Sequence, residues 1–268
     1  MTDRRNEDQP RILHSCYVNI SRSGEQFVAN HSLSYIVSGG YDIYLNGQTH
    51  SFKAGDFRFI AKNQLAKFTK YPAVNGEFKS IGVSIDQNTL HSVSEENNIS
   101  KQKNYTGETL FGLAPTPMLQ NFMDSLTPYL HNSGDINAII ARLKVKEAVM
   151  ILLETMPELK DLLFDFAEPG KIDLEAYMTE NYKFNVDINR FAYLTGRSLA
   201  TFKRDFERIF NTSPNKWLQE QRLKEAYFLL KEKGRKVTDV YIDAGFKDLS
   251  HFSFAFKKAY GVTPSKVA

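Results

Sequence analysis

Two adjacent cations, Lys203 and Arg204, lie in a segment whose spacing could place them against a nucleic acid. The segment SLATFKRDFERIF repeats its apolar residues at helical spacing, with Leu199, Phe202, Phe206, Ile209 and Phe210 on one face. The opposite face carries Ala200, Thr201, Lys203 and Arg204, and Ser198 directly precedes the helix; these five residues are the DNA-binding candidates of this segment. In the major groove of DNA, Lys and Arg donate to guanine O6 and N7 or to phosphate, and the methyl groups of Ala and Thr touch the thymine methyl. A solvated helix with two basic residues shows the same pattern, so both interpretations stay open here.

A second segment near the end of the chain, LSHFSFAFKKAY, has the same construction. Its apolar stripe is Phe252, Phe256 and Tyr260, and its outward residues are Leu249, Ser250, His251, Phe254, Lys257 and Lys258. The two lysines lie a turn further along the helix and suit phosphate contacts. His251 either contacts a base or is simply exposed.

Each of these predicted helices follows a short helix and a glycine turn. Asp187 can cap a helix that ends at Thr195-Gly196, and Ser198 can then cap the first reading helix. The second copy has a short helix from Val237 to Ala244, a break at Gly245, and the second reading helix. A long helix opened by Ser213-Pro214 and running to about Lys231 joins the copies. The internal repeat FERIFNTSP against FKKAYGVTP indicates two helix-turn-helix units.

The net charge of +3 divides unevenly along the chain. Residues 171–268 carry 18 Lys and Arg against 12 Asp and Glu, whereas residues 1–170 carry 16 against 19. Concentrated basic charge is typical of a domain that approaches phosphate. The balance supports a nucleic-acid partner for the C-terminal region.

The first part of the chain reads as β-structure. From Arg11 to about Ile85 the residues alternate and are broken by turn signals at Gly39-Gly40 and Asn46-Gly47, which predicts seven or eight short strands. That number suits a small antiparallel barrel or sandwich. The polar stretch 95–115 is predicted to be a loop. Five aromatic residues could line a ligand pocket or simply fill the core: Tyr35, Tyr44, Phe57, Phe59 and Phe68.

Two helices are predicted next, at about 116–130 and 135–154. The second has two apolar stripes, and we expect it to pack on its own domain and on a second copy of the chain; burial of both stripes within one monomer is the alternative. The dimerisation candidates are Ile136, Ile139, Ile140, Leu143, Val145, Val149 and Leu152. A short helix ending near Phe166 leads to a linker at 167–170. The predicted organisation is a β-barrel regulatory region at 1–115, a helical dimerisation region at 116–168 and a helix-turn-helix domain at 169–268.

A metal-dependent enzyme is the main competing class. Catalytic sites in small barrels of the cupin type need imidazole and carboxylate ligands that converge on one metal. The chain has no His-x-His pair, and His14, His31 and His50 are isolated in the sequence. It also lacks a P-loop, a dinucleotide-binding fingerprint and a nucleophile elbow. We therefore expect no metal, no cofactor and no catalysis.

Composition and the N-terminal residues bear on where the chain works. The longest apolar run, around Val149 to Leu153, is far below the ~20 residues needed to cross a bilayer. The charged start MTDRRNEDQPR lacks the apolar core of a signal peptide. The single cysteine, Cys16, suits a reducing compartment. These features predict a cytoplasmic protein with no membrane partner.

The C-terminal third resembles the AraC/XylS family of bacterial transcription regulators. The resemblance runs through the tail VTDVYIDAGFKDLSHFSFAFKKAYGVTPSK and the linker-helix segment SPNKWLQEQRLKEAYFLL. It implies reading helices in successive major grooves, with base contacts at Ala200, Lys203, Arg204, Ser250, His251 and Phe254. The family often has arginine where this chain has Phe254, so the second unit is expected to discriminate bases weakly or by apolar contact.

The front half resembles the family's cupin-like regulatory barrel. The segments LAPTPMLQNFMDSL and ARLKVKEAVMILLE are similar to the ExsA/ToxT branch, in which the long helix dimerises. The expected fold is therefore α+β and multidomain, with a cupin-like barrel plus helices and an all-α double helix-turn-helix domain. The expected function is a homodimeric activator that binds promoter DNA, contacts RNA polymerase and responds to a small molecule or partner protein. A metal-dependent cupin enzyme and a non-specific nucleic-acid-binding protein are the alternatives.

Overall fold

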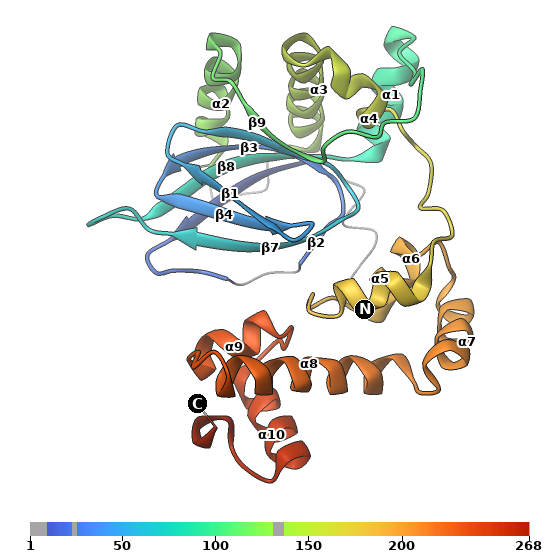
Figure 1. Ribbon diagram of the computed structural model, residues 1–268. Helices are drawn as coiled ribbons and strands as arrows, with labels where there is room; N and C mark the ends of the chain where they lie inside the picture. The colour runs from blue at the N-terminus through green and yellow to red at the C-terminus, as the bar shows by residue number, and fades with distance from the viewer. Residues whose placement is uncertain (1–9, 23–25, 131–136, 268) are drawn as a thin grey trace. The chain divides into compact units, whose positions relative to one another are not determined.

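The computed structural model describes residues 10–22, 26–130 and 137–267. The chain divides into two compact units (Figure 1). Unit 1 comprises Met1–Gly24 and Val28–Ala167, and unit 2 comprises Glu25–Phe27 and Glu168–Ala268. The β-structure and the all-helical region therefore fold around separate cores.

The described strands make two sheets. The five-stranded sheet has the order β1-β8-β3-β6-β9, and the four-stranded sheet has the order β2-β7-β4-β5. The strands are β1 (Arg11–Tyr17), β2 (Phe27–Val28), β3 (His31–Ser38), β4 (Gly40–Leu45), β5 (Gln48–Lys53), β6 (Phe57–Ile60), β7 (Gln64–Tyr71), β8 (Phe78–Ile85) and β9 (Leu110–Leu113). All pairs in the larger sheet are antiparallel. The region is thus a two-sheet, cupin-like arrangement, not a single closed ring of strands.

The hairpin of β4 and β5 confirms the predicted Asn46-Gly47 turn. Leu45 lies opposite Gln48, and the two residues between them have φ values of 48° and 80°. Positive φ at both central residues defines the type I′ turn, whose twist matches that of the flanking strands. The turn chemistry therefore sets the register of this pair.

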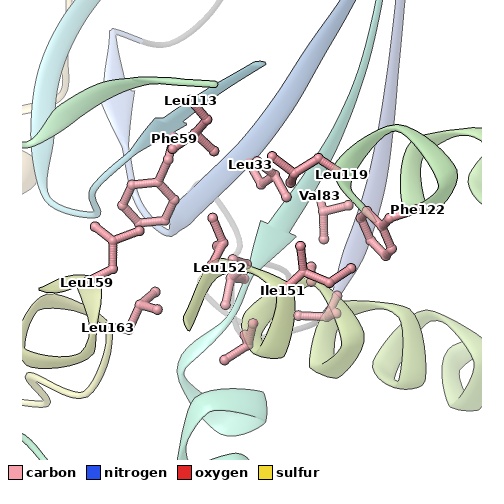
Figure 2. Packing of buried hydrophobic residues seen from close by; sticks show 14 of the residues in the cluster. Leu33, Phe59, Val83, Leu113, Leu119, Phe122, Ile151, Leu152, Leu159 and Leu163 are labelled. Carbon is pink, nitrogen blue, oxygen red and sulfur yellow. The ribbon is translucent and has the colours of Figure 1, made fainter. Parts of the chain in front are cut away.

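Alternation along the strands produces two apolar layers. One layer lies between the sheets and contains Ile36, Tyr41, Ile43, Leu45, Ile60, Ala66, Phe78 and Leu110. The other lies between the larger sheet and the helices. In Figure 2, Leu33, Phe59 and Val83 from the sheet face Leu119 of α2 (Pro117–Leu130) and Leu152 of α3 (Ala138–Thr155). The helices complete the same core as the strands, so they belong to one compact unit.

The predicted loop at 95–115 is wrong in two places. A helix, α1 (Gln87–Asn97), begins at the cap Asp86, whose carboxylate accepts the N–H of Thr89 at 2.9 Å. Strand β9 pairs with β6 and buries Leu110 and Leu113. Helix α1 buries only Thr89, Leu90 and Val93, and β9 is only four residues long, so neither element has a clear apolar periodicity in the sequence.

The helices of both helix-turn-helix units and the long helix between them agree with the predicted pattern, whereas the last helix of unit 1 ends at Leu163, three residues before the predicted end. Unit 1 ends with η2 (Pro157–Leu159) and α4 (Lys160–Leu163). Unit 2 consists of α5 (Leu174–Asn181), α6 (Ile188–Leu194), α7 (Leu199–Phe210), α8 (Pro214–Lys231), α9 (Val237–Asp243), α10 (Leu249–Tyr260) and η3 (Pro264–Lys266). No helix in the described part of the chain is long and apolar enough to cross a membrane.

Candidate nucleic-acid interface

A tight turn joins α6 to α7. Gly196 ends α6 with φ of +66°, and a Cβ at this position would collide with the backbone of Gly170 and Lys171. The next residue, Arg197, donates its N–H to the carbonyl of Ala192 at 2.9 Å. Only glycine fits this left-handed, crowded position without strain. The turn therefore fixes the angle at which α7 leaves α6.

The first turn of α7 is capped by Ser198, as predicted. The Ser198 hydroxyl accepts the N–H of Thr201 at 3.3 Å and lies 3.0 Å from the Thr201 hydroxyl. This pairing leaves Thr201 half-buried, whereas Ala200, Lys203 and Arg204 are exposed. All five predicted contact residues of this segment, Ser198 included, therefore lie at the start of α7, and the hydroxyl oxygen of Thr201 accepts a hydrogen bond from Ser198 in the free protein.

The opposite face of α7 is fully packed. Phe202 and Phe206 have no exposed surface. The ring of Phe206 lies 4.4 Å from that of Phe210 and 5.6 Å from that of Trp217 on α8, measured between centroids. Aromatic contacts of this kind hold a helix in one rotational setting. Lys203 and Arg204 consequently face away from the core.

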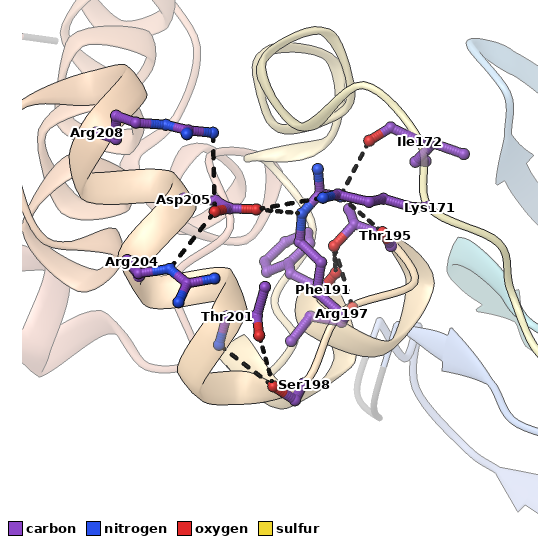
Figure 3. A network of polar contacts seen from close by, with 11 residues as sticks. Lys171, Ile172, Phe191, Thr195, Arg197, Ser198, Thr201, Arg204, Asp205 and Arg208 are labelled. Carbon is purple, nitrogen blue, oxygen red and sulfur yellow. Dashed lines mark hydrogen bonds and ion pairs between the residues drawn. The ribbon is translucent and has the colours of Figure 1, made fainter.

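A buried carboxylate, Asp205, lies at the centre of a cationic cluster (Figure 3). Arg197 donates its Nε–H to Asp205 Oδ2 at 3.2 Å, and both side chains are more than nine-tenths buried. Arg204, Arg208 and Lys171 place their nitrogens 3.8–3.9 Å from the same carboxylate. The hydrogen bond from Arg197, followed by the charges of Lys171 and Arg208, lowers the pKa of Asp205.

Arg197 connects this carboxylate to the start of the domain. Its guanidinium also donates to the carbonyls of Ile172 at 3.0 Å and Thr195 at 2.7 Å. The pair Arg197–Asp205 thus ties α7 to the turn and to the segment before α5. Sequence reasoning missed both residues; the available signal was Asp205, an acidic residue beside the apolar stripe of a helix that also carries three cations.

Helix α8 carries a second structural cation that sequence reasoning missed. Arg222 donates to the carbonyls of Tyr182 at 2.8 Å and Phe184 at 2.7 Å, and burial lowers its pKa to about 10. It remains charged at neutral pH because that value is well above 7. Nearby, Lys183 pairs with Glu225 at 2.8 Å. These contacts attach α8 to the segment that follows α5.

The second helix-turn-helix unit, α9 and α10, repeats the geometry of the first, α6 and α7. Gly245 breaks α9 with φ of +93°, and the carboxylate of Asp248 accepts the N–H of His251 at 2.7 Å to cap α10. Phe252 and Phe256 are fully buried. The predicted outward residues are all exposed: Leu249, Ser250, His251, Phe254, Lys257 and Lys258. Left-handed residues end both helices, Asn211 after α7 and Gly261 after α10.

Comparison with known families assigns both units. The helix-turn-helix domain family matches residues 191–268, and the ExsA N-terminal regulatory domain family matches residues 31–163. The chain belongs to the AraC/XylS family. This AraC/XylS protein is therefore a DNA-binding transcription regulator, as the tail and linker-helix motifs predicted, and its N-terminal match agrees with the ExsA/ToxT branch that the two front-half segments predicted.

Two related proteins and one solved structure resemble this chain along most of its length. The chain is 25% identical over 252 residues to the thermoregulatory protein LcrF of Yersinia pestis, which covers 89% of this chain and 90% of LcrF. It is 26% identical over 243 residues to the virulence regulon transcriptional activator VirF of Yersinia enterocolitica, covering 87% of each. A crystal structure of apo ToxT from Vibrio cholerae aligns over 95% of this chain and 96% of ToxT with a TM-score of 0.46 and 12% identity.

Within the regulatory unit, the predicted pocket residues have different environments. Phe57 and Phe59 are fully buried between the sheet and the helices, with Tyr35 packed against them. Phe68 packs against the layer between the sheets, and Tyr44 is 39% exposed. The five side chains therefore do not share one site. A single pocket lined by all five is not formed by them, and control of this unit by an effector stays a prediction.

The two stripes of α3 also separate. Val145, Val149 and Leu152 have no exposed surface and belong to the core of unit 1, so their assignment to a dimer interface is wrong. They pack among apolar side chains of the larger sheet, and the other stripe is left in solvent. Ile139 is 72% exposed, Leu143 60% and Ile140 37%. Ile136 lies outside the described residues.

The histidines of unit 1 are likewise dispersed. His31 is fully buried, stacks on Phe59 at 5.6 Å and accepts the backbone N–H of Lys62 through Nδ1 at 3.2 Å. Burial, with a smaller contribution from Lys62, lowers its pKa to about 3, so it is neutral. Among the described residues, no three His, Cys, Asp or Glu side chains gather in a way that could hold a metal ion.

Proposed function

We propose that this regulator activates transcription by placing α7 and α10 in two successive major grooves of promoter DNA. The observation that carries the proposal is the pairing of two capped helices, each with a buried aromatic face and an exposed face that includes Lys203 and Arg204 in one and Lys257 and Lys258 in the other. Helix α8, with 18 residues, extends about 27 Å at ~1.5 Å per residue. That length is of the order of one helical turn of DNA, about 34 Å.

Activation and contact with RNA polymerase are part of the same proposal. A relative that covers 87% of this chain, VirF, is described as a transcriptional activator. The match of residues 31–163 to a regulatory domain supports control through unit 1, by a small molecule or a partner protein.

Dimerisation through α3 is also proposed. Ile139, Leu143 and Met150 are spaced by four and seven residues, so they lie along one line of the helix, and each is exposed. An apolar line on a surface helix is a suitable partner for its own symmetry copy. A dimer would present four reading helices to two half-sites.

Genome-wide occupancy mapping followed by footprinting tests the proposal. Each bound subunit should protect about two turns of DNA, roughly 20 base pairs, and a promoter carrying the mapped site should be induced by the protein. Equal affinity for the mapped site and for random DNA at the same salt concentration would instead support a non-specific nucleic-acid-binding protein. Repression or no effect at every mapped promoter would contradict activation.

A further inference from the structure

The two reading helices differ at one equivalent position. The helix-turn-helix units superpose in sequence with an offset of 50 residues, which pairs Ser198 with Asp248 as helix caps and Phe202 with Phe252 in the cores. The same offset pairs Arg204 with Phe254. A guanidinium in the first unit is therefore replaced by a phenyl ring at the same place on the reading face.

Phe254 has no evident role in the fold of its own unit. It is 71% exposed, whereas its neighbours Phe252 and Phe256 are completely buried. Its ring makes no aromatic or cationic contact with the described residues. A single exposed apolar residue is ordinary on a protein surface, so its exposure alone does not indicate a function. Its position on the reading face does. It lies one turn after Ser250 on the face that carries His251.

The surroundings of the two positions differ in the same sense. Beside Arg204, Asp205 supplies a carboxylate 3.9 Å from the guanidinium, and the equivalent residue of the second unit is Ala255. The first two turns of α10 contain no Lys or Arg; its cations, Lys257 and Lys258, are in the last turn. At the position of Phe254 the second reading face is thus apolar, whereas the first carries the charge of Arg204 at the equivalent position.

The thymine methyl is the apolar group that the base edges present in the major groove, and guanine presents the paired acceptors that suit arginine. We propose that Phe254 is the specificity-determining residue of the second helix-turn-helix unit and selects thymine through its methyl group, while Arg204 selects guanine in the first helix-turn-helix unit. This inference rests on the proposed reading of two grooves. It divides the operator into a guanine-read half and a thymine-read half.

Parallel selections from random DNA test the assignment. The full-length protein is used to select duplexes from two pools, one made with thymine and one with uracil, which lacks only the methyl group. From the thymine pool the wild type should enrich guanine in one half of the site and thymine in the other. From the uracil pool the guanine preference should remain and the second preference should disappear. A uracil substitution in the best site should weaken binding about three- to tenfold.

Three variants locate the effect. Phe254→Ala should bind thymine and uracil sites equally and keep the guanine preference. Arg204→Ala, the matched control at the equivalent position, should lose the guanine preference and keep the thymine one. Phe254→Arg should gain a guanine preference in the second half. Because both side chains are exposed, thermal unfolding should be unchanged in all three.

The outcomes separate the inference from the proposal beneath it. If the wild type enriches uracil as strongly as thymine, or if Phe254→Ala keeps the difference between them, the assignment of Phe254 is wrong. A ring that wedges between bases or contacts another protein gives that result. If no sequence is enriched from either pool, the proposed two-groove reading fails as well.

Discussion

At the scale of single residues, Arg204 and Asp205 show how one helix serves both DNA and its own fold. Asp205 is 6% exposed, and burial of a carboxylate is unfavourable unless hydrogen bonds and an opposite charge compensate it. Arg197 does so from a similarly buried position. Arg204, by contrast, is largely in solvent, where its ion pair with Asp205 adds little to stability. Its guanidinium is therefore available to a base.

Replacing Arg204 by Ala should cost ~1–3 kcal/mol of binding free energy at the preferred site and relax specificity at one position. The reason is the loss of a bidentate contact to guanine. Competition binding against single-base variants of the site measures this. Lys258→Ala is the control: it should weaken all sequences alike and reduce the salt slope by about 1. If Arg204→Ala also weakens all sequences alike, Arg204 contacts phosphate.

Asp205→Asn should lower the stability of unit 2 in a pH-dependent way. The pKa of Asp205 is lowered in the folded protein, so its contribution to stability is present above the unfolded pKa of about 3.9 and is lost as pH falls through the folded value. Denaturant unfolding should show a constant difference between wild type and variant from pH 7 to pH 5. The difference should shrink below about pH 4. A difference that is independent of pH would exclude the carboxylate charge as its cause.

At the scale of elements, the angle between paired helices depends on turns that only glycine can make. Gly245 has φ of +93°, and a Cβ there would lie 2.7 Å from the carbonyl oxygen of Lys183 and 2.9 Å from Nε of Arg222. The turn that contains Gly245 therefore lies close to Lys183 and Arg222, whose contacts attach α8 to the segment that follows α5. Gly234, with φ of +56°, has open space around it.

Gly245→Ala should destabilise unit 2 by about 1–3 kcal/mol, because strain from the left-handed backbone adds to the steric clash. Gly234→Ala is the matched control and bears the backbone strain alone, so its loss should be smaller. Chemical denaturation measures both, and DNA binding should fall with Gly245→Ala more than with the control. Equal losses would mean that the contacts with Lys183 and Arg222 relax without cost.

Helix boundaries in unit 2 could be predicted because their ends carry local signals. Asp187, Ser198 and Pro214 mark starts, and Gly196 and Gly245 mark stops, and each acts through its own backbone or side chain. Strand β9 carries no such signal, since its place depends on pairing with β6, about 50 residues earlier. The pair Arg197–Asp205 was hidden for a similar reason: its members become partners only once the turn has folded.

At the scale of the whole molecule, the two parts of the chain differ in the sign of their net charge. Residues 171–268 carry an excess of Lys and Arg, and residues 1–170 carry an excess of Asp and Glu. The sequence could place two apolar stripes on α3 but could not say which faces the sheet, because both have similar residues. Packing decides it: the stripe with Val145 and Val149 is buried, and the stripe with Ile139 and Leu143 is not.

The exposed stripe supports a test of assembly and of DNA binding together. Ile139→Asp combined with Leu143→Asp should convert the proposed dimer to a monomer in sedimentation equilibrium, because it places charge in an apolar contact. The Tm should change little, since both side chains are in solvent. Binding to paired half-sites should weaken about 10²- to 10⁴-fold as the advantage of linked binding is lost, while a single half-site should bind as before. Met118→Asp, at a 47% exposed residue on the neighbouring helix α2, is the control and should remain dimeric. A double variant that stays dimeric, or a control that dissociates equally, would remove α3 as the dimerising element.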